Sequence, residues 1–387
     1  MDAAAPPTRA VTRGPKHHFF GYYDKTPWDA TGRYVLGVEA GFMDRAPTPE
    51  DEAVVGLIDT ARGDAWAPLA ATTAWHWQFG PMLQWLPAAP DRTVAFNVRR
   101  EGSFGAALLD VFTREERALP LPIAALSPDK GTALSVNFSR LADMRPGYGY
   151  GGLRDPGYDG PHPADDGVFR MDLATGESEL IVSLDRAAAL NRRPDMDGCK
   201  HWFNHLVINT DGSRFAFLHR WRPPDRDARK TRLLTAGLDG SDLRCIADDD
   251  MVSHYDWRDA ERILAWARQR DAGDRFFLFN ERTGGREVIG EGVLTGDGHC
   301  SYSPDRRWIL LDAYPDERHE RALMLFDPAE GRRVDLGRFH SPPALAGPIR
   351  CDLHPRWSRD GHHVCMDSVH EGTRQIYVID VSAIVEP

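Results

Sequence analysis

A hairpin motif recurs seven times along this chain and limits what the chain can fold into more than any other feature. Each copy has an aromatic residue or serine, a turn containing Asp or Gly, and an apolar or alternating run, as in YSPDRRWILLDA from Tyr302 and WSRDGHHVCMDS from Trp357. Most copies are spaced by roughly the 40 to 50 residues of one four-stranded propeller blade. The turn aspartates are Asp29, Asp91, Asp129, Asp211, Asp259, Asp305 and Asp360. The repeat predicts an all-β fold, a seven-bladed β-propeller of four-stranded antiparallel blades.

The two ends of the chain predict how the blades are completed. The last copy ends after QIYVIDV, which supplies a third strand but no fourth, and an open sheet edge invites aggregation. We therefore expect a strand near residues 9–13 to close the ring. A long gap before Asp211 indicates an inserted loop region at about 139–200, with a short helix near Ser183, inside a single domain spanning 1–387. The alternatives are a pair of β-sandwiches or a ring of six or eight blades.

Composition restricts the function classes. The 387 residues include 47 basic and 58 acidic side chains, and the formal net charge of −11 lacks the basic field that nucleic-acid binding requires. No apolar run approaches the roughly 18 to 20 residues that cross a bilayer, and the N-terminal stretch lacks the apolar core of a secretion signal. The five cysteines show no CxxC spacing. These features predict a cytoplasmic protein that binds neither nucleic acid nor membrane, and they leave the oligomeric state open.

Histidines gather where the predicted inner strands begin. The first strand of each propeller blade lines the central channel, so residues just before the hairpin turns converge there although they are distant in sequence. His254, His299 and His354 precede successive turns, and Asp352 points to the same side of a strand as His354. Three imidazoles and a carboxylate satisfy a Zn or Mn site. The alternative is that these histidines cap inner strands by hydrogen bonding to backbone carbonyls.

Cationic and aromatic side chains complete the predicted channel. Arginine grips a carboxylate in a bidentate fork, and the phenol groups of the GYGYGG loop can serve as acid or base. The residues predicted to contact substrate are His18, Tyr22, His76, Arg99, Asn137, Arg140 and His201. Those predicted to be catalytic are His205, His254, Arg220, Tyr148 and Tyr150. A separate set recurs at one blade position and is predicted to pack between blades: Trp28, Trp85, Trp257 and Trp357.

Four segments resemble the seven-bladed polysaccharide lyases, namely the oligogalacturonate lyases and, more loosely, the ulvan lyases. These segments are HHFFGYYDKTPW, SHYDW, GDGHCSYSPD and DLHPRWSRDG. The resemblance implies a divalent metal, manganese in type, at His299 and His354, and a catalytic role for His254. The chain differs from the family pattern at Asp352, where a second histidine is usual, and near Ile349, where no glutamine ligand can be placed.

The resemblance implies β-elimination on an acidic, uronate-containing oligosaccharide. A cation must neutralise the uronate carboxylate, and we assign this task to the metal and Arg220. A base must remove the proton beside the carboxylate, and we assign it to His205 or His254 because histidine is poised near neutrality. We assign the acid that protonates the leaving oxygen to Tyr148 or Tyr150.

Two other functions remain open at this point. The first is a non-enzymatic carbohydrate-binding or assembly propeller of the TolB kind, since a fold does not settle a function. The second is a metal-dependent glycoside hydrolase, which requires a close pair of carboxylates. Asp24 and Asp256 are the candidates for that pair.

Overall fold

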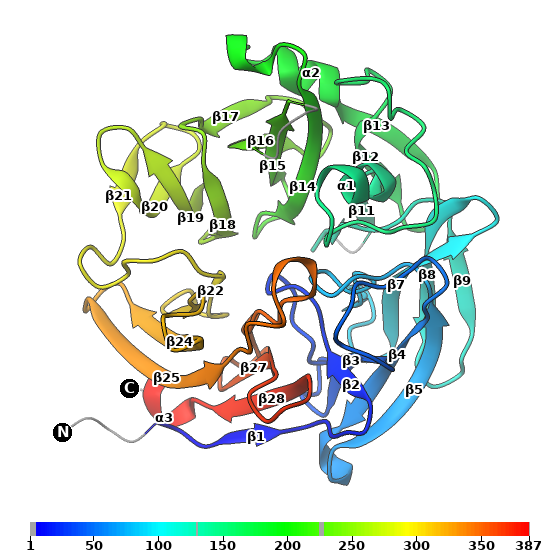
Figure 1. The fold of residues 1–387 in the computed structure, drawn as a ribbon, viewed down its shortest axis with the longest axis vertical. Coiled ribbons are helices and arrows are strands. Elements are labelled where there is room, and N and C mark those ends of the chain that lie inside the picture. The colour runs from blue at the N-terminus through cyan, green and yellow to red at the C-terminus, as the bar shows by residue number, and fades with distance from the viewer. Residues whose placement is uncertain (1–4, 129–130, 224–227, 387) are drawn as a thin grey trace. The chain divides into compact units, whose positions relative to one another are not determined.

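The structure, a computed structural model, describes residues 5–128, 131–223 and 228–386. Its strands form seven four-stranded antiparallel sheets, the blades of a seven-bladed β-propeller, so the predicted fold is confirmed (Figure 1). The turn residue Asp129 lies outside the described residues. Residue contacts divide the chain into two compact units, each described by itself below: 1–99 with 107–117 and 295–387, and 100–106 with 118–294. The single domain stays a prediction.

Four blades belong wholly or mainly to the first unit. One blade contains β2 (His17–Phe19), β3 (Tyr34–Ala40), β4 (Ala53–Asp59) and β5 (Ala65–Thr72). The next contains β6 (Gln84–Trp85), β7 (Thr93–Arg100), β8 (Ser103–Asp110) and β9 (Glu116–Leu119). The last two contain β22 (Cys300–Tyr302), β23 (Ile309–Asp312), β24 (Glu320–Asp327) and β25 (Arg332–His340), and then β26 (Arg356–Trp357), β27 (His363–Ser368), β28 (Gln375–Asp380) and β1 (Thr8–Ala10).

Three whole blades lie in the second unit, together with the parts of β7, β8 and β9 that fall within 100–106 and 118–119. They contain β10 (Ala125–Leu126), β11 (Thr132–Ser135), β12 (Gly167–Asp172) and β13 (Ser178–Ser183); β14 (Lys200–Ile208), β15 (Arg214–Arg222), β16 (Lys230–Gly237) and β17 (Arg244–Ala247); and β18 (Val252–Trp257), β19 (Arg262–Gln269), β20 (Gly273–Asn280) and β21 (Arg286–Val288). The helical segments of the chain are short: α1 (Phe138–Met144), α2 (Leu184–Ala189), α3 (Ser382–Val385), η1 (Thr60–Arg62), η2 (Pro194–Met196) and η3 (Gly347–Ile349). Among the described residues, none of the helices has the length and apolar character needed to span a bilayer.

An N-terminal strand completes the last blade, as the sequence predicts. β1 pairs antiparallel with β28, with Thr8 opposite Ile379 and Ala10 opposite Tyr377 (Figure 1). Val11, just beyond β1, is fully buried and packs in an apolar cluster with Ile376. The pairing gives the outer edge of β28 the backbone partners that an exposed strand edge lacks.

The predicted insertion is divided between two connections. The stretch 136–166, which contains α1, joins β11 to β12, and the stretch 184–199, which contains α2 and η2, joins β13 to β14. The strands β12 and β13 lie within the bounds given for the insertion, and they pair as the blade hairpin that the segment GVFRMDLATGE indicates. The expected helix begins after Ser183, whose hydroxyl accepts a hydrogen bond from the backbone N–H of Arg186 at 3.0 Å.

The repeated tryptophans pack between blades as predicted. All are buried, and burying such a ring stabilises the fold by on the order of 4 kcal/mol at about 25 cal/mol per Å². Three indole N–H groups also donate to a backbone carbonyl of the preceding blade: Trp85 to Pro27, Trp257 to Val207 and Trp357 to Ser301. The tryptophan of the repeat therefore joins one blade to the next.

Candidate metal centre

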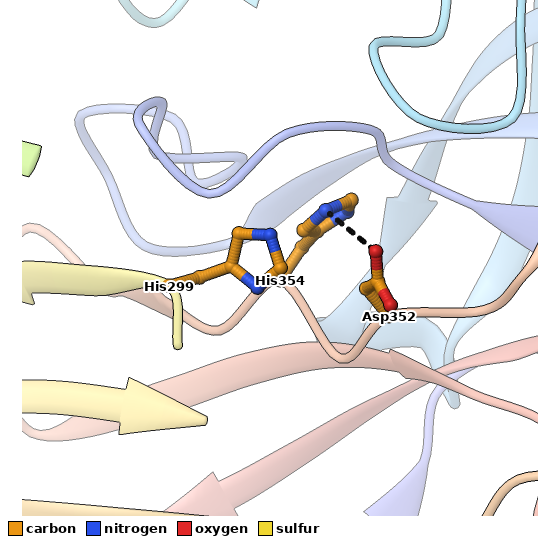
Figure 2. Close-up of side chains that lie close together, drawn as sticks. All are labelled: His299, Asp352 and His354. Atoms are coloured by element: carbon orange, nitrogen blue, oxygen red, sulfur yellow. Dashed lines mark ion pairs between the residues drawn. The ribbon is translucent and has the colours of Figure 1, made fainter. Parts of the chain in front are cut away.

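His299, Asp352 and His354 come together in the first unit (Figure 2). Their candidate donor atoms all lie within 4.8 Å of one another. His299 directly precedes β22, and the other two residues lie in the segment that leads into β26. The two imidazole rings are 4.3 Å apart and nearly perpendicular, and all three side chains are buried.

Asp312 orients His299 and also holds the backbone of His354. The Nδ1 atom of His299 lies 2.9 Å from the Asp312 Oδ1 atom, and the His299 backbone N–H donates to the same oxygen at 2.7 Å. The His354 backbone N–H donates to Asp312 Oδ2 at 3.3 Å. A carboxylate on the far nitrogen of a metal-binding histidine fixes its tautomer and ring orientation. Although burial raises the pKa of Asp312, the charge and hydrogen bonds of His299 lower it overall.

The backbone beside each of the two histidines has a conformation or a close contact that most residues could not adopt, and this lets the two rings lie close together. A Cβ atom on Gly298 would lie 1.8 Å from the backbone oxygen of Asp312, so only glycine permits the close packing beside His299. His354 has a φ of 42°, in the left-handed region that costs a non-glycine residue about 1–3 kcal/mol. Such strain clusters at functional sites, since the surrounding structure must maintain it.

Two arginines hold Asp352. Arg321 Nη2 lies 2.7 Å from Asp352 Oδ1, and Arg350 Nε lies 2.6 Å from Oδ2. The His354 Nε2 atom is 3.8 Å from Oδ2. A carboxylate offers about four lone-pair positions, so these two contacts leave capacity for another partner. The guanidinium charges nevertheless offset the negative charge that a cation would meet.

The residue types at this position fit a divalent metal. Neutral imidazole and carboxylate are the donors of Zn and Mn sites, and the Asp312–His299 contact supplies the supporting interaction that such sites use. His299, His354 and Asp352 would hold the ion. These three residues are among the four that the sequence assigns to the metal. The fourth, His254, lies on β18 of the second unit.

Tyrosines of the first unit surround the two histidines. The Tyr22 ring lies 4.9 Å from His354 and 5.7 Å from His299, and the Tyr23 ring lies 5.1 Å from His299. The sequence assigns Tyr22 to substrate contact, and the structure places it against both candidate ligands. Tyr23 was not singled out from the sequence.

A buried ion pair positions the segment that carries these tyrosines. Arg356 makes a bidentate contact with Asp367, at 3.0 and 2.8 Å, and its Nε atom donates to the backbone oxygen of Tyr22 at 3.2 Å. Asp367 also accepts from the backbone N–H of Phe20 at 3.1 Å. Gly21 has a φ of 133°, and a Cβ atom there would lie 2.8 Å from a neighbouring backbone oxygen. The side chains of Arg356 and Asp367 thus fix the backbone of the segment that carries Tyr22 and Tyr23.

The other predicted residues of the first unit lie at different places. His18 is buried on β2, and Arg99 is partly exposed on β7. His76 is buried in the connection before β6, and burial, followed by the charges of Arg350 and Arg374, lowers its pKa to about 3. His76 is therefore neutral near neutral pH. The substrate roles of these residues stay predictions.

In the second unit, the predicted catalytic residues are buried. His254 lies on β18 with its Nδ1 atom 3.2 Å from Ser253 Oγ, and Arg220 lies on β15. His205 lies at an irregularity in β14, has a φ of 51°, and contacts the Tyr255 ring at 4.6 Å. The left-handed backbone of His205 is a local strain of the kind found at functional sites. Its role as a base stays a prediction.

Two predicted acids occupy packed positions in the same unit. The Tyr150 ring stacks on Phe138 at 4.5 Å, and an Arg145 nitrogen lies 3.3 Å from the Tyr148 hydroxyl. Both tyrosines are buried. Their contacts give Tyr150 a place in the core of the inserted stretch, and the proposed acid role of either residue stays a prediction.

His201, Arg140 and Asn137 take part in buried hydrogen-bond networks. His201 Nδ1 lies 2.8 Å from His219 Nε2, and Arg232 Nε donates to His219 Nδ1 at 3.0 Å. Burial lowers the pKa of His201 to about 3. Arg140 pairs with Asp155 at 2.9 Å and also donates to four backbone oxygens. The Asn137 Oδ1 atom caps α1, and its Nδ2 donates to Asp155 at 2.9 Å and to Asp166 at 3.0 Å. These contacts support the fold, and they leave the predicted substrate roles as predictions.

Sequence reasoning missed three residues of the centre: Asp312, Arg321 and Arg350. The sequence could have indicated Asp312, because counting outward from the turn of the β22–β23 hairpin places Asp312 opposite His299. Arg321 lies on β24, and Arg350 follows η3. Nothing in the local sequence pattern connects either arginine to Asp352.

Comparison with solved structures supports the resemblance at the level of fold. No protein-family profile and no curated protein sequence matches the chain. An oligogalacturonate lyase from Vibrio parahaemolyticus superimposes with a TM-score of 0.68 at 14% identity, over 98% of this chain and 95% of that chain. The chain shares the fold of the oligogalacturonate lyases. An oligogalacturonate lyase in complex with manganese gives a TM-score of 0.69 at 16% identity, over 98% and 94% of the two chains.

The same architecture also occurs in proteins of another function. The β-propeller domain of the Trilobed protease from Pyrococcus furiosus matches with a TM-score of 0.56 at 11% identity, over 94% of this chain and 96% of that domain. Since peptidase propellers and lyases both superimpose on this chain, the function must be argued from the site.

Proposed function

We propose that this protein is a lyase that cleaves uronate-containing oligosaccharides by β-elimination, with a divalent metal held by His299, His354 and Asp352. The observation that carries the proposal is the buried triad with Asp312 behind it. The manganese-bound structure of an oligogalacturonate lyase with the same fold supports the choice of reaction class and of metal type.

The reaction requires three groups around one sugar ring. A base removes the proton on the carbon beside the carboxylate, the electron pair forms a carbon–carbon double bond, and the glycosidic carbon–oxygen bond breaks. An acid then protonates the leaving oxygen. When bound, the divalent ion supplies positive charge that stabilises the negative charge developing on the carboxylate.

The residues of the first unit can support this chemistry without taking the proton themselves. Asp312 keeps His299 in one tautomer, and the ion pairs of Asp352 with Arg321 and Arg350 fix the position of its carboxylate. His205 or His254 as base, Arg220 as a second cation and Tyr148 or Tyr150 as acid remain the assignments that the sequence makes. Mutation of each residue tests these assignments directly.

One observation favours a binding propeller without catalysis. Both oxygens of Asp352 are paired with arginines, and this charge compensation weakens the attraction for a metal relative to the histidine-rich family pattern. A metal assay on the purified protein separates the two functions, because stoichiometric Mn or Zn favours the lyase. The glycoside hydrolase hypothesis has weaker support: Asp24 is paired with Lys25 at 2.8 Å, and Asp256 lies in the second unit.

The decisive experiment is a screen of saturated oligouronates for unsaturated products. Product formation is followed by the ultraviolet absorbance of the conjugated double bond, with metal-loaded protein and with chelator-treated protein. We expect absorbance to rise only with the loaded protein. The His254→Ala and His205→Ala variants should show which histidine is the base, and unchanged turnover in both would remove these two residues from the mechanism. Loaded protein that yields no unsaturated product from any oligouronate contradicts the proposal.

A further inference from the structure

A pocket in the first unit lies apart from the metal triad, since none of its lining residues belongs to the triad. Its volume is about 360 Å³, within the range of about 300–1,000 Å³ that small-molecule sites occupy. It is lined by the segment 11–16, which follows β1, and by His18, Glu39, Asp64 and Trp66. We call it the Trp66 pocket.

Two glycines place the Trp66 ring. Gly37 on β3 and Gly56 on β4 are directly opposite in the sheet register. A Cβ atom on Gly56 would lie 2.6 Å from the Trp66 ring, and one on Gly37 would lie 3.1 Å from it. The glycine pair therefore leaves a depression in the sheet that the indole fills, and the indole and the His18 ring lie 4.9 Å apart in a T-shaped arrangement. The aromatic wall of the pocket is built into the blade.

Hydrogen bonds fix the tautomer of His18. Gln375 Nε2 donates to the Lys16 backbone oxygen at 2.9 Å, so Gln375 Oε1 is the atom that faces His18 Nδ1 at 3.1 Å. His18 Nδ1 must then carry the proton and donate it to that oxygen. Burial lowers the pKa of His18, which keeps the ring neutral near neutral pH and leaves Nε2 as an acceptor.

Acceptor atoms without donors collect in this pocket. His18 Nε2 is buried and lacks a hydrogen bond of good geometry, because its contact at 3.4 Å is with Glu39 Oε2, which is an acceptor toward the neutral ring. Asp64 Oδ1 is buried without a hydrogen-bond partner, while Oδ2 pairs with Arg9. Buried polar atoms in native proteins are almost always satisfied. Each of these acceptors therefore calls for a donor that a bound molecule can bring.

Donors are also available at the rim. Lys16 Nζ contacts Glu39 Oε1 at 2.6 Å, and the Lys16 side chain is 57% exposed. Arg13 lines the pocket and is exposed. The charges of Arg13 and Lys16 offset those of Glu39 and Asp64 in the lining, so the net charge of the pocket favours neither an organic cation nor an anion. A metal ion is also disfavoured, because within the described part of the chain the only three-donor group is the triad of His299, Asp352 and His354.

We propose that the Trp66 pocket binds a single pyranose ring of a neutral sugar, with an acidic sugar bound more weakly because of the carboxylates of Glu39 and Asp64. Hydroxyl groups of the sugar donate to the acceptors of His18, Glu39 and Asp64, while other oxygens accept from Lys16. The apolar C–H face of the ring packs on Trp66. This site shares no residue with the metal triad, and it gives His18, which the sequence assigns to contact with the lyase substrate, a role in a second contact with a glycan.

Binding is tested on the full-length protein by saturation-transfer NMR with D-galactose, D-glucose and D-galacturonate as probes. We expect at least one probe to bind with a Kd on the order of 1 mM. Asp64→Asn and Glu39→Gln keep the shape of the pocket and replace an acceptor oxygen by a donor, and each should weaken binding about tenfold. The matched control Glu330→Gln changes an exposed carboxylate at a distant turn and should leave binding unchanged.

Two further variants keep the test decisive. If loss of a carboxylate disturbs folding, Trp66→Phe provides a second test, because it keeps an aromatic ring in the wall of the pocket. This variant should bind the sugar more weakly while its circular dichroism spectrum stays native. His299→Ala should abolish metal binding while leaving the sugar signal intact, which separates this pocket from the proposed lyase site. The proposal is overturned if none of the probes gives a saturable signal, or if the pocket variants bind as tightly as the unmodified protein.

Discussion

The carboxylate of Asp312 touches both histidines of the candidate metal centre: it meets the His299 ring at 2.9 Å and the His354 backbone N–H at 3.3 Å. One buried side chain thus couples two candidate ligands that are far apart in the sequence. Its charge and geometry decide how well the pair can hold an ion.

Replacing Asp312 with asparagine should weaken metal binding. The amide has the same size, but it cannot stabilise the donating tautomer of His299 through a negative charge, and losses of this kind cost about 10- to 100-fold in metal affinity. Competition titration with a chromophoric chelator measures the change for Mn and Zn. The exposed Glu330→Gln serves as the control, and an unchanged affinity in Asp312→Asn would show that His299 needs no such support.

Removing either imidazole should abolish stoichiometric metal. We expect His299→Ala and His354→Ala to lose the ion, because two donors of a three-donor site remain and the pairing of Asp352 with arginines limits what it can contribute. Elemental analysis of the purified, desalted variants provides the measurement. His340→Ala, at an exposed position on β25, should retain the metal. Full occupancy in both triad variants would place the metal elsewhere.

Breaking the Arg356–Asp367 pair should strongly destabilise the protein. Both partners are buried and Asp367 also holds the Phe20 backbone, so Asp367→Asn leaves an uncompensated guanidinium and should cost about 3–5 kcal/mol of unfolding free energy. Urea unfolding measures this cost. The matched variant Asp274→Asn breaks an exposed pair with Arg268 and should cost less than about 1 kcal/mol. Equal losses in the two variants would contradict the role given to burial.

His76 should make the protein sensitive to mild acid. Its folded-state pKa of about 3 lies below the unfolded value, so the unfolded chain binds a proton that the folded chain does not. The stability that this difference provides is present above the unfolded pKa and is lost as the pH falls, by about 2 kcal/mol between about pH 7 and about pH 5.

The variant His76→Gln isolates this effect from the other titrating groups. The unfolding free energy, measured with urea at several pH values, should fall less steeply with decreasing pH in this variant than in the unmodified protein. His340→Gln should keep the original slope, since that side chain is exposed. Identical slopes in the protein and in His76→Gln would mean that folding leaves the pKa of His76 unchanged.

Periodicity in the sequence was sufficient to determine the blades. A four-stranded sheet depends on local alternation and on tight turns, and both can be read from segments such as SYSPDRRWILLD. The incomplete final blade indicated β1 for the same reason, because an unpaired edge strand needs a backbone partner. His299, His354 and Asp352 could be selected because the start of each inner strand has a fixed place in a propeller.

The tertiary structure alone decided what surrounds those residues. Arg321 and Arg350 reach Asp352 from a neighbouring strand and from a connecting segment, and no local pattern records such a contact. Packing across the sheet likewise brings the Trp66 indole over Gly56 and close to the His18 ring, a contact that no sequence pattern indicated. Strand pairing follows short-range rules, whereas side-chain charge compensation depends on which blades and loops meet in space.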